Sequence, residues 1–421
     1  MDILVVGGGG REHAIVWSLS KSSKAGKIYC APGNAGIAQL AECVPIGVFE
    51  FDRLTAFAKE KEVGLVVIGP DDPLAAGIVD AFEAQDIPVF GPRRNAAEIE
   101  GSKTFMKDLL HKYNIPTAAY QKFSEYEPAL SYLREQELPI VIKADGLAAG
   151  KGVTVAYSRE EAEQALLDIM VTKVFGEAGA QVVIEEFLEG QEMSILAFVD
   201  GETVRPMAAA QDHKPIFDGD KGPNTGGMGT YSPLPHIDDS IIQEAVDTII
   251  IPTAKAMVAE GRPFSGVLFA GLMISPDGKP KTIEFNARFG DPETQVVLPR
   301  LRSDLLDIFL AVVEGRLADI EIQWSDEAAV CVVLASGGYP GPYPKGVPIS
   351  GLSTSRNELI FHAGTALDDS GRWITNGGRV LGVVGIGPNI AEARTAAYQR
   401  ADGIFFEGKQ NRSDIAAKAL V

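Results

Sequence analysis

The sequence is poor in the residue that builds disulfide frameworks and many zinc sites. Its 421 residues include only three cysteines, Cys30, Cys43 and Cys331, and no two of them form a CxxC pair. An odd number of scattered thiols excludes a disulfide-stapled secreted fold and a cysteine-based zinc site. The cysteine content therefore fits a protein of a reducing compartment.

Long hydrophobic runs and an excess of positive charge are also missing. No stretch approaches the roughly 18 apolar residues of a membrane span, and the opening MDILVVGGGG has no basic region before its short apolar run, so it predicts a strand rather than a signal peptide. Lys and Arg number 38 against 57 Asp and Glu, a formal net charge of −19. Non-specific binding to nucleic acid or anionic lipid needs a positive field. We therefore expect a cytoplasmic protein with neither nucleic acid nor membrane as a partner.

What the sequence does contain is an alternation of strand and helix patterns over its first hundred residues. Helical stretches at 12–20, 51–61 and 74–84 separate short β-branched runs at 3–6, 27–31, 64–68 and 88–90. Buried strands separated by amphipathic helices predict βαβ units and a parallel sheet, with a ligand site at the carboxyl ends of its strands.

The remaining chain predicts three further parts. After a helix at 103–113, strands around one helix at 159–170 predict a small α+β lid. Strands and two helical stretches, 240–259 and 303–314, come next, and a final group has strands at 329–335, 358–366 and 380–387 with a helix at 390–400. The sequence thus predicts an α/β protein divided into 1–102, 103–188 (with the lid at about 118–188), 189–322 and 323–421.

A glycine run, Gly7 to Gly10, lies between the first predicted strand and helix. Four free backbone N–H groups and the helix dipole favour an anion there, so a phosphate site is one interpretation and a tight turn is the other. The dinucleotide fingerprint needs a glycine where Glu12 stands, and no carboxylate follows Cys30-Ala31 to hold an NAD ribose. NAD is therefore disfavoured. Loops at 32–36 and 69–73 follow later strands and would line the same edge.

A second glycine-rich segment, 143–153, reads KADGLAAGKGV. It differs from a Walker loop because Gly152 stands where Ser or Thr is required and no helix follows. A hairpin that folds over phosphates, with Lys143 on its strand and Lys151 in its loop, is one interpretation. A surface hairpin with solvated lysines is the other.

Two further segments have polar groups in useful places. The run EEFLEGQE at 185–192 leads from a buried strand into a polar turn, where the backbone can bind an adenine edge or serve only as a crossover. In IEFNARFGDPE, alternation along a strand turns Glu284, Asn286 and Arg288 to one face. Carboxylate and amide oxygens suit Mg²⁺, and a guanidinium suits a phosphoryl group or a carboxylate. The alternative is a structural ion pair between Glu284 and Arg288.

The order of these pieces resembles that of the ATP-grasp ligases. Finer segments, among them GGGGREH, GPDDPLAAGIVD, KADGLAAGKGV, QDHKPIFDGDKGPNTGGMGTYSP, FNARFGDPE, HAGTAL and GGRVLGV, resemble the phosphoribosylamine–glycine ligase family over residues 1 to about 419. The resemblance implies an ATP-grasp fold in which a Rossmann-like parallel-sheet domain, a small α+β lid and a C-terminal mixed α/β domain surround the site. It implies a monomeric carbon–nitrogen ligase of purine biosynthesis that joins glycine to 5-phosphoribosylamine through glycyl phosphate, with ATP as co-substrate and Mg²⁺ or Mn²⁺.

The resemblance also implies roles for individual residues. Those expected to contact ATP are Lys103, Lys143, Gly146, Gly150, Lys151, Gly152, Glu185, Glu186, Phe187, Leu188 and Glu192. The metal ligands are Glu284 and Asn286, and the catalytic residues are Arg288, Lys143 and Asp212. Those expected to contact glycine or phosphoribosylamine are Gly9, Gly10, Asn34, Pro70, Asp71, Asp212, Asn224, Thr225, Gly226, Gly227, Arg288, Gly290 and Asp291.

Two segments depart from the pattern of the family. The third loop reads GPDDPL where the family usually has GPEAPL, so the carboxylate of Asp71 is shorter by one methylene, with Asp72 beside it, and its reach to the ribose is reduced. The strand VLFAG at 267–271 lacks the additional acidic metal ligand that many ATP-grasp enzymes have there. We therefore expect one firmly bound metal ion and a second held mainly by the nucleotide.

The histidines are expected to have supporting roles. His13 is predicted to cap or pack the first loop, and His213 to orient Asp212, while His111, His236 and His362 show no ligand spacing. Three rival functions remain: an ATP-grasp ligase for another carboxylate, a nucleotide sensor without turnover, and an NAD-dependent oxidoreductase.

Overall fold

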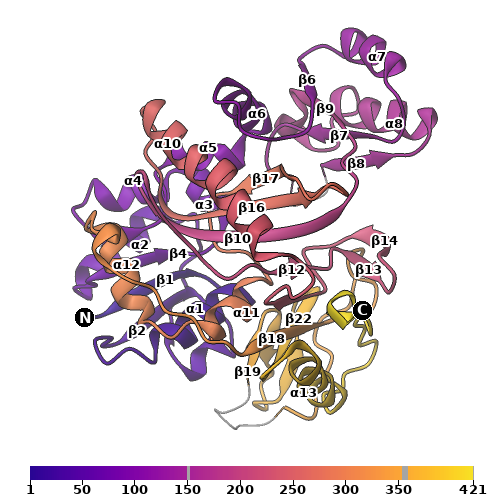
Figure 1. Cartoon of the computed structure of the whole chain (residues 1–421). Coiled ribbons are helices and arrows are strands. Elements are labelled where there is room, and N and C mark those ends of the chain that lie inside the picture. Colours follow the sequence, from indigo (N-terminus) through magenta and orange to yellow (C-terminus); the bar gives the residue numbers. More distant parts are fainter. Residues whose placement is uncertain (149–151, 353–358, 421) are drawn as a thin grey trace.

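The computed structural model describes residues 1–148, 152–352 and 359–420 (Figure 1). Its strands form sheets of five, four, five and four strands, with two additional two-stranded pairs, in the described part of the chain. No helix in these ranges has the length and apolar character needed to cross a bilayer.

The N-terminal sheet is parallel, as predicted, with strand order β3-β2-β1-β4-β5. Its strands are β1 (Ile3–Gly7), β2 (Ile28–Pro32), β3 (Glu42–Cys43), β4 (Leu65–Ile68) and β5 (Val89–Phe90). Its helices are α1 (Gly10–Leu19), α2 (Phe51–Glu60), α3 (Asp71–Ala76), α4 (Ile78–Glu83) and α5 (Arg94–Gly101). Because β1 and β4 are buried along their whole length, they have the near-continuous apolar sequence typical of parallel strands.

The single helix predicted at 74–84 is wrong. Gly77 has a φ of +95°, in the left-handed region, and separates α3 from α4. A residue with a Cβ rarely adopts this conformation, so the glycine is what permits the break. The earlier start of α3 places Asp71 in its first turn.

The lid follows α6 (Lys103–Lys112) and has the strand order β6-β9-β7-β8. Its elements are β6 (Tyr120–Phe123), α7 (Tyr126–Glu135), β7 (Ile140–Ala144), β8 (Val153–Ala156), α8 (Arg159–Met170) and β9 (Val182–Glu186). The prediction of one lid helix is wrong because α7 was overlooked. Pro128 lies in the first turn of α7, where a missing N–H is tolerated, and Ala129, Leu130 and Leu133 form a short buried face. The lid has a hydrophobic cluster of its own and stands apart from the other sheets in Figure 1.

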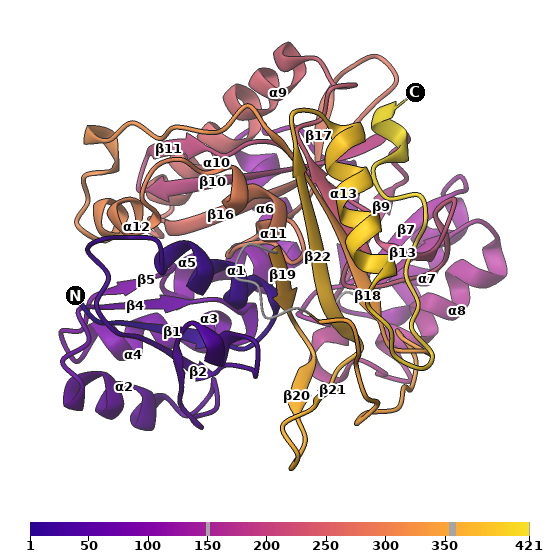
Figure 2. The ribbon, with the colours of Figure 1, turned by 90° about the horizontal axis from the view of Figure 1, so that it is seen from below.

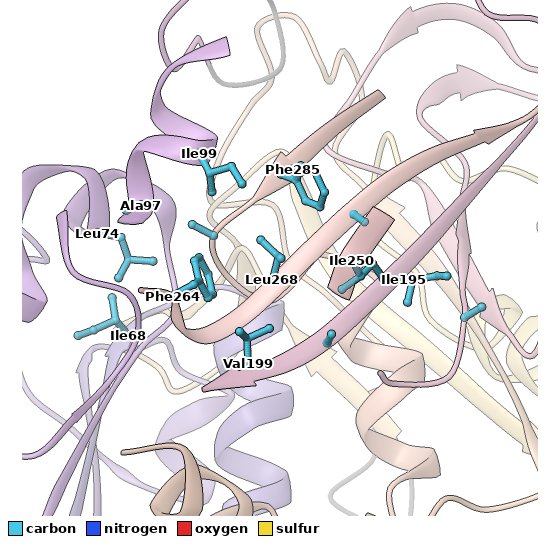
Figure 3. Packing of buried hydrophobic residues seen from close by; sticks show 14 of the residues in the cluster. Ile68, Leu74, Ala97, Ile99, Ile195, Val199, Ile250, Phe264, Leu268 and Phe285 are labelled. Atoms are coloured by element: carbon cyan, nitrogen blue, oxygen red, sulfur yellow. The ribbon is translucent and has the colours of Figure 1, made fainter. Parts of the chain in front are cut away.

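The central sheet has the order β11-β10-β16-β17, with strands β10 (Gln191–Asp200), β11 (Thr203–Pro206), β16 (Ser265–Ile274) and β17 (Pro280–Asn286). Its helical segments are α9 (Asp239–Ala245), a π-helical turn (Val246–Ile250), α10 (Ile251–Ala259), α11 (Thr294–Val297) and α12 (Leu305–Val313). Figure 3 shows Phe264, Leu268 and Phe285 of this region packed toward Ile68 and Ile99 of the N-terminal region, and all five belong to one buried cluster. The two sheets therefore share a core.

The C-terminal sheet combines strands from both sides of the predicted boundary at 322/323. In order it contains β12 (Gln211–Asp212), β15 (Gly229–Ser232), β18 (Ala328–Ala335), β22 (Arg379–Gly387) and β19 (Leu359–His362). Helix α13 (Ile390–Asp402) packs on β22 and β18, as Figure 2 shows. Because Asp212 lies in the edge strand β12, the last hundred residues are tied directly to a predicted site residue.

The strand predicted at 358–366 is divided. β19 joins the C-terminal sheet, whereas β20 (Thr365–Leu367) pairs with β21 (Trp373–Thr375), and residue 358 lies outside the described part. At the bend, a Cβ on Gly364 would lie 2.5 Å from the Cα of Gly377, so the backbones approach too closely for a side chain. The remaining elements are β13 (Pro215–Phe217), β14 (Lys221–Asn224) and short 3₁₀ turns at 37–39, 176–179, 298–300, 317–319 and 417–420.

Candidate active site

The three predicted loops of the N-terminal sheet meet at the carboxyl edge of its strands. A Cβ on Gly8 would lie 2.6 Å from the carbonyl oxygen of Gly33, and a Cβ on Gly69 would lie 2.1 Å from Oε1 of Glu12. The Asn34 amide nitrogen also donates to the Gly8 carbonyl oxygen at 2.9 Å. The loops after β1, β2 and β4 therefore form one surface, and their glycines are required by its close packing.

Glu12 corrects the expectation of four free N–H groups in the first loop. Its Oε2 accepts a hydrogen bond of 2.7 Å from the Gly9 N–H, while its Oε1 accepts one of 2.6 Å from Arg11 Nε. The glutamate thus caps α1 from within the chain. In a dinucleotide-binding loop the residue at position 12 would be a glycine without a side chain. Here the Glu12 carboxylate occupies that space.

Asn34 and the third loop are held by local hydrogen bonds. The Asn34 amide nitrogen also donates to the His362 carbonyl oxygen at 2.8 Å, and its Oδ1 accepts from the N–H groups of Gly36 and Ile37. Pro70 is the N-cap residue of α3, and Asp71 begins that helix. A role for the Asn34 side chain in binding substrate remains a prediction, because its amide already links three chain segments.

On the nucleotide side, the predicted lysines converge on a buried carboxylate. Lys143 on β7 lies 3.0 Å from Glu185 Oε1, and Lys107 on α6 lies 3.2 Å from Glu185 Oε2. All three side chains are at most 5% exposed. Lys103, one turn before Lys107, donates to the Gly146 carbonyl oxygen at 3.2 Å. Glu185 is therefore a shared counter-ion of two lysines, and its predicted contact with the nucleotide stays a prediction.

The glycine hairpin starts where this lysine cluster ends. A Cβ on Gly146 would lie 2.9 Å from the Ala178 Cβ, and one on Gly152 would lie 2.8 Å from the Ala148 Cβ. The other two hairpin residues predicted to contact nucleotide, Gly150 and Lys151, lie outside the described residues.

A cavity of about 290 Å³ lies beside the turn between β9 and β10. Its lining residues are Glu186, Phe187, Leu188, Glu189, Met273, Ser275, Pro276 and Lys281. The backbone N–H of Glu186 donates to Ala119, and its carboxylate pairs with Lys281 at 3.2 Å. Three predicted adenine contacts thus line one concave surface, with apolar walls from Phe187, Leu188 and Met273.

Glu284 and Asn286 lie together at the end of β17, next to a lysine that the sequence analysis had not singled out. Lys214 Nζ lies 3.7 Å from Glu284 Oε1 and 3.5 Å from Glu192 Oε2. Burial disfavours the charged form of Glu284, but the ammonium groups of Lys214, Lys143 and Lys103 outweigh it and lower its pKa. Glu284 is therefore a charged carboxylate in a cationic setting.

Arg288 pairs with Glu100 of α5 rather than with Glu284. Its Nη2 lies 3.0 Å from Glu100 Oε1 and donates to Asn286 Oδ1 at 3.2 Å, while Glu100 Oε2 accepts from the Ala287 N–H at 2.7 Å. Burial raises the pKa of Glu100 to about 7 even though Arg288 opposes this. The described contacts therefore contradict the alternative of an ion pair along the strand face.

Two acidic side chains, Asp212 and Glu293, lie close to each other, and Glu293 is near Arg288. Burial, together with the charge of Glu293, raises the pKa of Asp212 well above its usual range. Gly227 and Gly290 make room for these carboxylates, because a Cβ would lie 2.7 Å from Asp212 Oδ1 and 2.4 Å from Glu293 Oε2, respectively. A carboxylate pair of this kind, with Glu293 buried and Asp212 half-buried, can hold a proton or an ammonium group.

The glycine-rich loop from Asn224 to Gly227 is folded back on the segment before it. The Thr225 hydroxyl donates to the Lys214 carbonyl oxygen at 2.7 Å and accepts from the Gly227 N–H at 3.0 Å. Asn224 and Gly226 are exposed, whereas Gly227 is buried beside Asp212. Thr225 therefore fixes the loop, and Asn224 remains accessible.

Asp291 lies where the N-terminal loop approaches this acidic region. Gln295 donates to Asp291 Oδ1 at 2.8 Å, and a Cβ on Gly9 would lie 3.6 Å from Asp291 Oδ2. Arg11 reaches the same segment by donating to the Phe289 carbonyl oxygen at 3.2 Å. Residues 288–291 thus separate the nucleotide-side lysines from the glycine loops.

His13 and His213 hold neighbouring parts of the site in place through hydrogen bonds. His13 Nδ1 accepts a 2.8 Å hydrogen bond from the His362 N–H, so His13 packs the first loop against the C-terminal sheet. The His213 backbone N–H donates to Asp212 Oδ1 at 2.7 Å, while its ring Nδ1 lies 3.1 Å from the Gly229 carbonyl oxygen. His213 therefore orients Asp212 through its backbone and not its ring.

Sequence reasoning missed five functional neighbours: Glu100, Lys107, Lys214, Glu293 and Arg379. Lys107 and Lys214 carried a local signal, since one follows Lys103 by a helical turn and the other follows Asp212 by two residues. Glu100 and Arg379 contact residues 187 and 88 positions away, respectively. Glu100 and Ala287, like Arg379 and Asp291, are too far apart in the sequence for one short motif to contain both residues.

Comparisons with known proteins match the whole length of this chain. Models of the phosphoribosylglycinamide synthetase N domain, ATP-grasp (A) domain and C domain match residues 1–100, 101–294 and 329–418. The phosphoribosylamine–glycine ligase of Halalkalibacterium halodurans is 52% identical over 421 residues, which cover all of this chain and 97% of that one. The chain belongs to the phosphoribosylglycinamide synthetase family.

Other members and solved structures agree with this family assignment. The ligase of Caldanaerobacter subterraneus is 51% identical over 99% of this chain and 100% of its own. The crystal structure of the Thermotoga maritima ligase has a TM-score of 0.87 and 35% identity, and the match covers 99% of this chain and all of that one. A biotin carboxylase from Campylobacter jejuni, 15% identical with a TM-score of 0.74 over 97% of this chain and 92% of that one, shares the fold. The chain is thus an ATP-grasp carbon–nitrogen ligase of the glycine-ligating step of purine biosynthesis, and its family uses ATP with divalent metal ions.

Proposed function

We propose that this chain joins glycine to 5-phosphoribosylamine through glycyl phosphate, with conversion of ATP to ADP and phosphate. The observation that carries the proposal is the position of residues 286–291. On one side they adjoin the lysines around Glu284, and on the other they touch the glycine loops through Arg11 and Gly9. A carboxylate phosphorylated at this segment would be within reach of an amine held at the N-terminal sheet.

In the first step a glycine carboxylate oxygen attacks the γ-phosphorus of ATP, and ADP leaves. Lys103 and Lys143 hold the phosphates, the described hairpin residues Gly146 and Gly152 adjoin them, and the cavity at 186–188 takes adenine. Glu192 binds the ribose hydroxyls, with Lys214 fixing its position. Preorganised cations are the main means by which proteins stabilise a phosphoryl group in transfer. Arg288, braced by Glu100, holds the glycine carboxylate and the forming acyl phosphate.

In the second step the amine nitrogen attacks the acyl carbon, phosphate leaves, and the nitrogen loses a proton. Gly9, Gly10, Asn34, Pro70 and Asp71 line the edge that takes the sugar phosphate. Asp212 with Glu293 receives the proton, because its raised pKa makes it a better base than an exposed aspartate. The loop 224–227, with Gly290 and Asp291, completes the glycine and amine pocket.

Glu284 and Asn286 are proposed to hold Mg²⁺ or Mn²⁺. The charged Glu284 and the Asn286 amide oxygen are hard donors, which suit an ion that binds through few protein ligands and several phosphate oxygens. No group of three or more His, Cys, Asp or Glu with metal-binding geometry occurs among the described residues, so the donor set fits a metal delivered with the nucleotide. When bound, the ion would neutralise phosphate charge beside the two lysines.

We further propose that the protein is a cytoplasmic monomer divided at 1–102, 103–188, 189–322 and 323–421. The net charge of −19 supports solubility and disfavours anionic surfaces as partners. The buried core that joins the N-terminal and central sheets supports a single stable body for the site.

The test is ADP release with ATP and Mg²⁺ while the co-substrates are varied. Release should require both glycine and phosphoribosylamine, and glycinamide ribonucleotide should form in equal amount. Stimulation by another carboxylic acid, with no response to glycine, would instead support a different ATP-grasp ligase. Tight ATP binding without turnover would support a sensor, and NADH binding to the first lobe would support the oxidoreductase.

A further inference from the structure

Arg379, at the start of β22, extends from the C-terminal sheet into the active site. Its Nη1 donates to the carbonyl oxygens of Gly226 and Asp291, each at 2.9 Å, and approaches that of Gly227 at 3.4 Å. Its Nη2 lies 3.4 Å from the Asp291 carboxylate. One guanidinium therefore bonds two loops that are about 65 residues apart in the chain.

The loop backbone is shaped around this guanidinium. A Cβ on Gly226 would lie 3.0 Å from the Arg379 Cζ, so a side chain at this position would press on the guanidinium and shift it. The Gly226 N–H is held from the same domain, because it donates to the Tyr339 hydroxyl at 3.0 Å. Both polar backbone groups of Gly226 are thus fixed by residues of the C-terminal segment.

Asp291 is the point at which all three sheets come together. Its carboxylate approaches Arg379 of the C-terminal sheet, Gln295 of α11 and the Gly9 backbone of the N-terminal loop. Burial disfavours the charged form of Asp291, but Arg379, first among the opposing groups, outweighs it, and the Asp291 pKa is lowered. Removing the guanidinium would free both the loop and the carboxylate.

We propose that Arg379 is a positioning residue that holds the 224–227 loop and Asp291 in the arrangement needed for glycine and phosphoribosylamine. It acts through these two segments, since its Nη1 donates to the carbonyl oxygens of Gly226 and Asp291 and its Nη2 lies beside the Asp291 carboxylate. The residues proposed to bind ATP lie on α6, the lid and the central sheet, and the hydrogen bonds and ion pair described for Arg379 include none of them. The inference rests on the proposed function and adds that the C-terminal sheet is part of the ligation site.

The test compares Arg379→Met and Arg379→Lys with Arg372→Met. Arg372 lies in the same C-terminal segment, is 69% exposed and pairs only with nearby Asp368 in the described contacts, so it reports on loss of an arginine away from the site. Lysine preserves the charge near Asp291, but its single ammonium lacks the planar fork that bonds two loops at once. Steady-state constants for each substrate and equilibrium binding of ATP would be measured for all three variants.

We expect Arg379→Met to raise the KM for glycine and for phosphoribosylamine about 10- to 100-fold and to lower kcat, with the ATP affinity within about twofold of wild type. Arg379→Lys should fall between Arg379→Met and wild type, and Arg372→Met should match wild type. If Arg379 only stabilised the fold, Arg379→Met would weaken ATP binding as much as it raises the KM values for glycine and phosphoribosylamine, and it would lower Tm.

Three outcomes would overturn the proposal: normal glycine and phosphoribosylamine constants in Arg379→Met, an equal loss toward ATP, or full activity in Arg379→Lys. If Arg379→Met does not fold, the substrate pattern of Arg379→Lys decides. Wild type and Arg372→Met must first release ADP only with both co-substrates. Failure there would refute the proposed function and not the role of Arg379.

Discussion

Glu185, Glu284 and Arg288 each lie beside a side chain of the opposite charge. Glu185 is the clearest case, because two buried ammonium groups share its two oxygens. In the proposed mechanism, Lys143 acts on a nucleotide phosphate while it remains near this carboxylate. Lys107, which also donates to the Thr117 hydroxyl at 2.7 Å, balances Glu185 from the other side.

Lys107→Met should therefore weaken ATP binding although Lys107 itself is 0% exposed. Without it, Glu185 holds Lys143 more strongly and less of its charge is available to the phosphates. We expect the KM for ATP to rise about tenfold and the free energy of unfolding to fall by on the order of 3 kcal/mol, as when one partner of a buried ion pair is removed. Steady-state kinetics and urea unfolding would measure the two effects.

Lys112→Met is the matched control, since Lys112 is on the same helix, exposed, and paired with Glu260 at the surface. It should change neither quantity appreciably. An unaltered KM for ATP in a folded Lys107→Met protein would show that pairing with Glu185 does not limit the charge that Lys143 offers to the phosphates.

At the residue scale, the sequence predicted side chains that act through local spacing and missed those that act across the fold. Glu284 and Asn286 follow from alternation along β17, whereas Arg288, predicted on the same strand face, lies two residues past the end of that strand. Glu100 and Arg379 do not, because the contacts that define them exist only after distant segments have packed. Glu185 shows a second limit: its segment was identified, but the partners of its side chain come from two other elements.

At the scale of elements, loops between strands and helices carry most of the site, and their glycines are required where backbones touch. The loop between β1 and α1 was predicted as an anion site with free N–H groups. The structure adds Glu12, which bonds the Gly9 N–H, and Gln295, whose amide nitrogen would lie 2.8 Å from a Cβ on Gly10. The loop is therefore packed directly against the segment that carries Asp291.

Gly10→Val should raise the KM for phosphoribosylamine much more than that for ATP. The added side chain would displace Gln295, which donates to Asp291, and would crowd the approach to the first loop. We expect a change of tenfold or more for phosphoribosylamine and less than about twofold for ATP. Kinetics with each substrate varied in turn would measure both, and equal changes would mean that the first lobe is not the sugar-phosphate site.

Most elements were predictable because their apolar periods are regular. The parallel N-terminal strands and α8 follow directly from such patterns. The wrong predictions have local causes. Gly77 ends α3 within a continuous apolar pattern, and Pro128 in the first turn of α7 is a residue that usually indicates the absence of a helix. The bend at Gly364 divides one predicted strand between two sheets. Sheet membership was less predictable still, because β15 pairs with β18, which lies about a hundred residues later, and β12 joins the same sheet only through β15.

At the scale of the whole molecule, the site exists only because the N-terminal, central and C-terminal sheets are fixed to one another. One junction, between the N-terminal region and β19 of the C-terminal sheet, is made by hydrogen bonds between neutral groups. His13 of α1 accepts a hydrogen bond from the His362 N–H, and the Asn34 amide donates to the His362 carbonyl oxygen. Burial, reinforced by the neighbouring His362, lowers the pKa of His13 to about 3, and burial lowers that of His362 to about 4.

This junction should make the fold sensitive to mild acid. Between pH 6.5 and about 4 the unfolded chain binds protons at these histidines and the folded chain does not, so their contribution to the free energy of unfolding should fall as the pH falls through that window and be constant above it. For His13 alone the loss at pH 5 should be about 2 kcal/mol. His13→Asn keeps an acceptor for the His362 N–H but cannot be protonated, so its unfolding free energy should change less between pH 7.5 and 5 than that of wild type. Urea unfolding of both proteins across this range measures the difference, and parallel pH curves would assign the acid sensitivity to other groups.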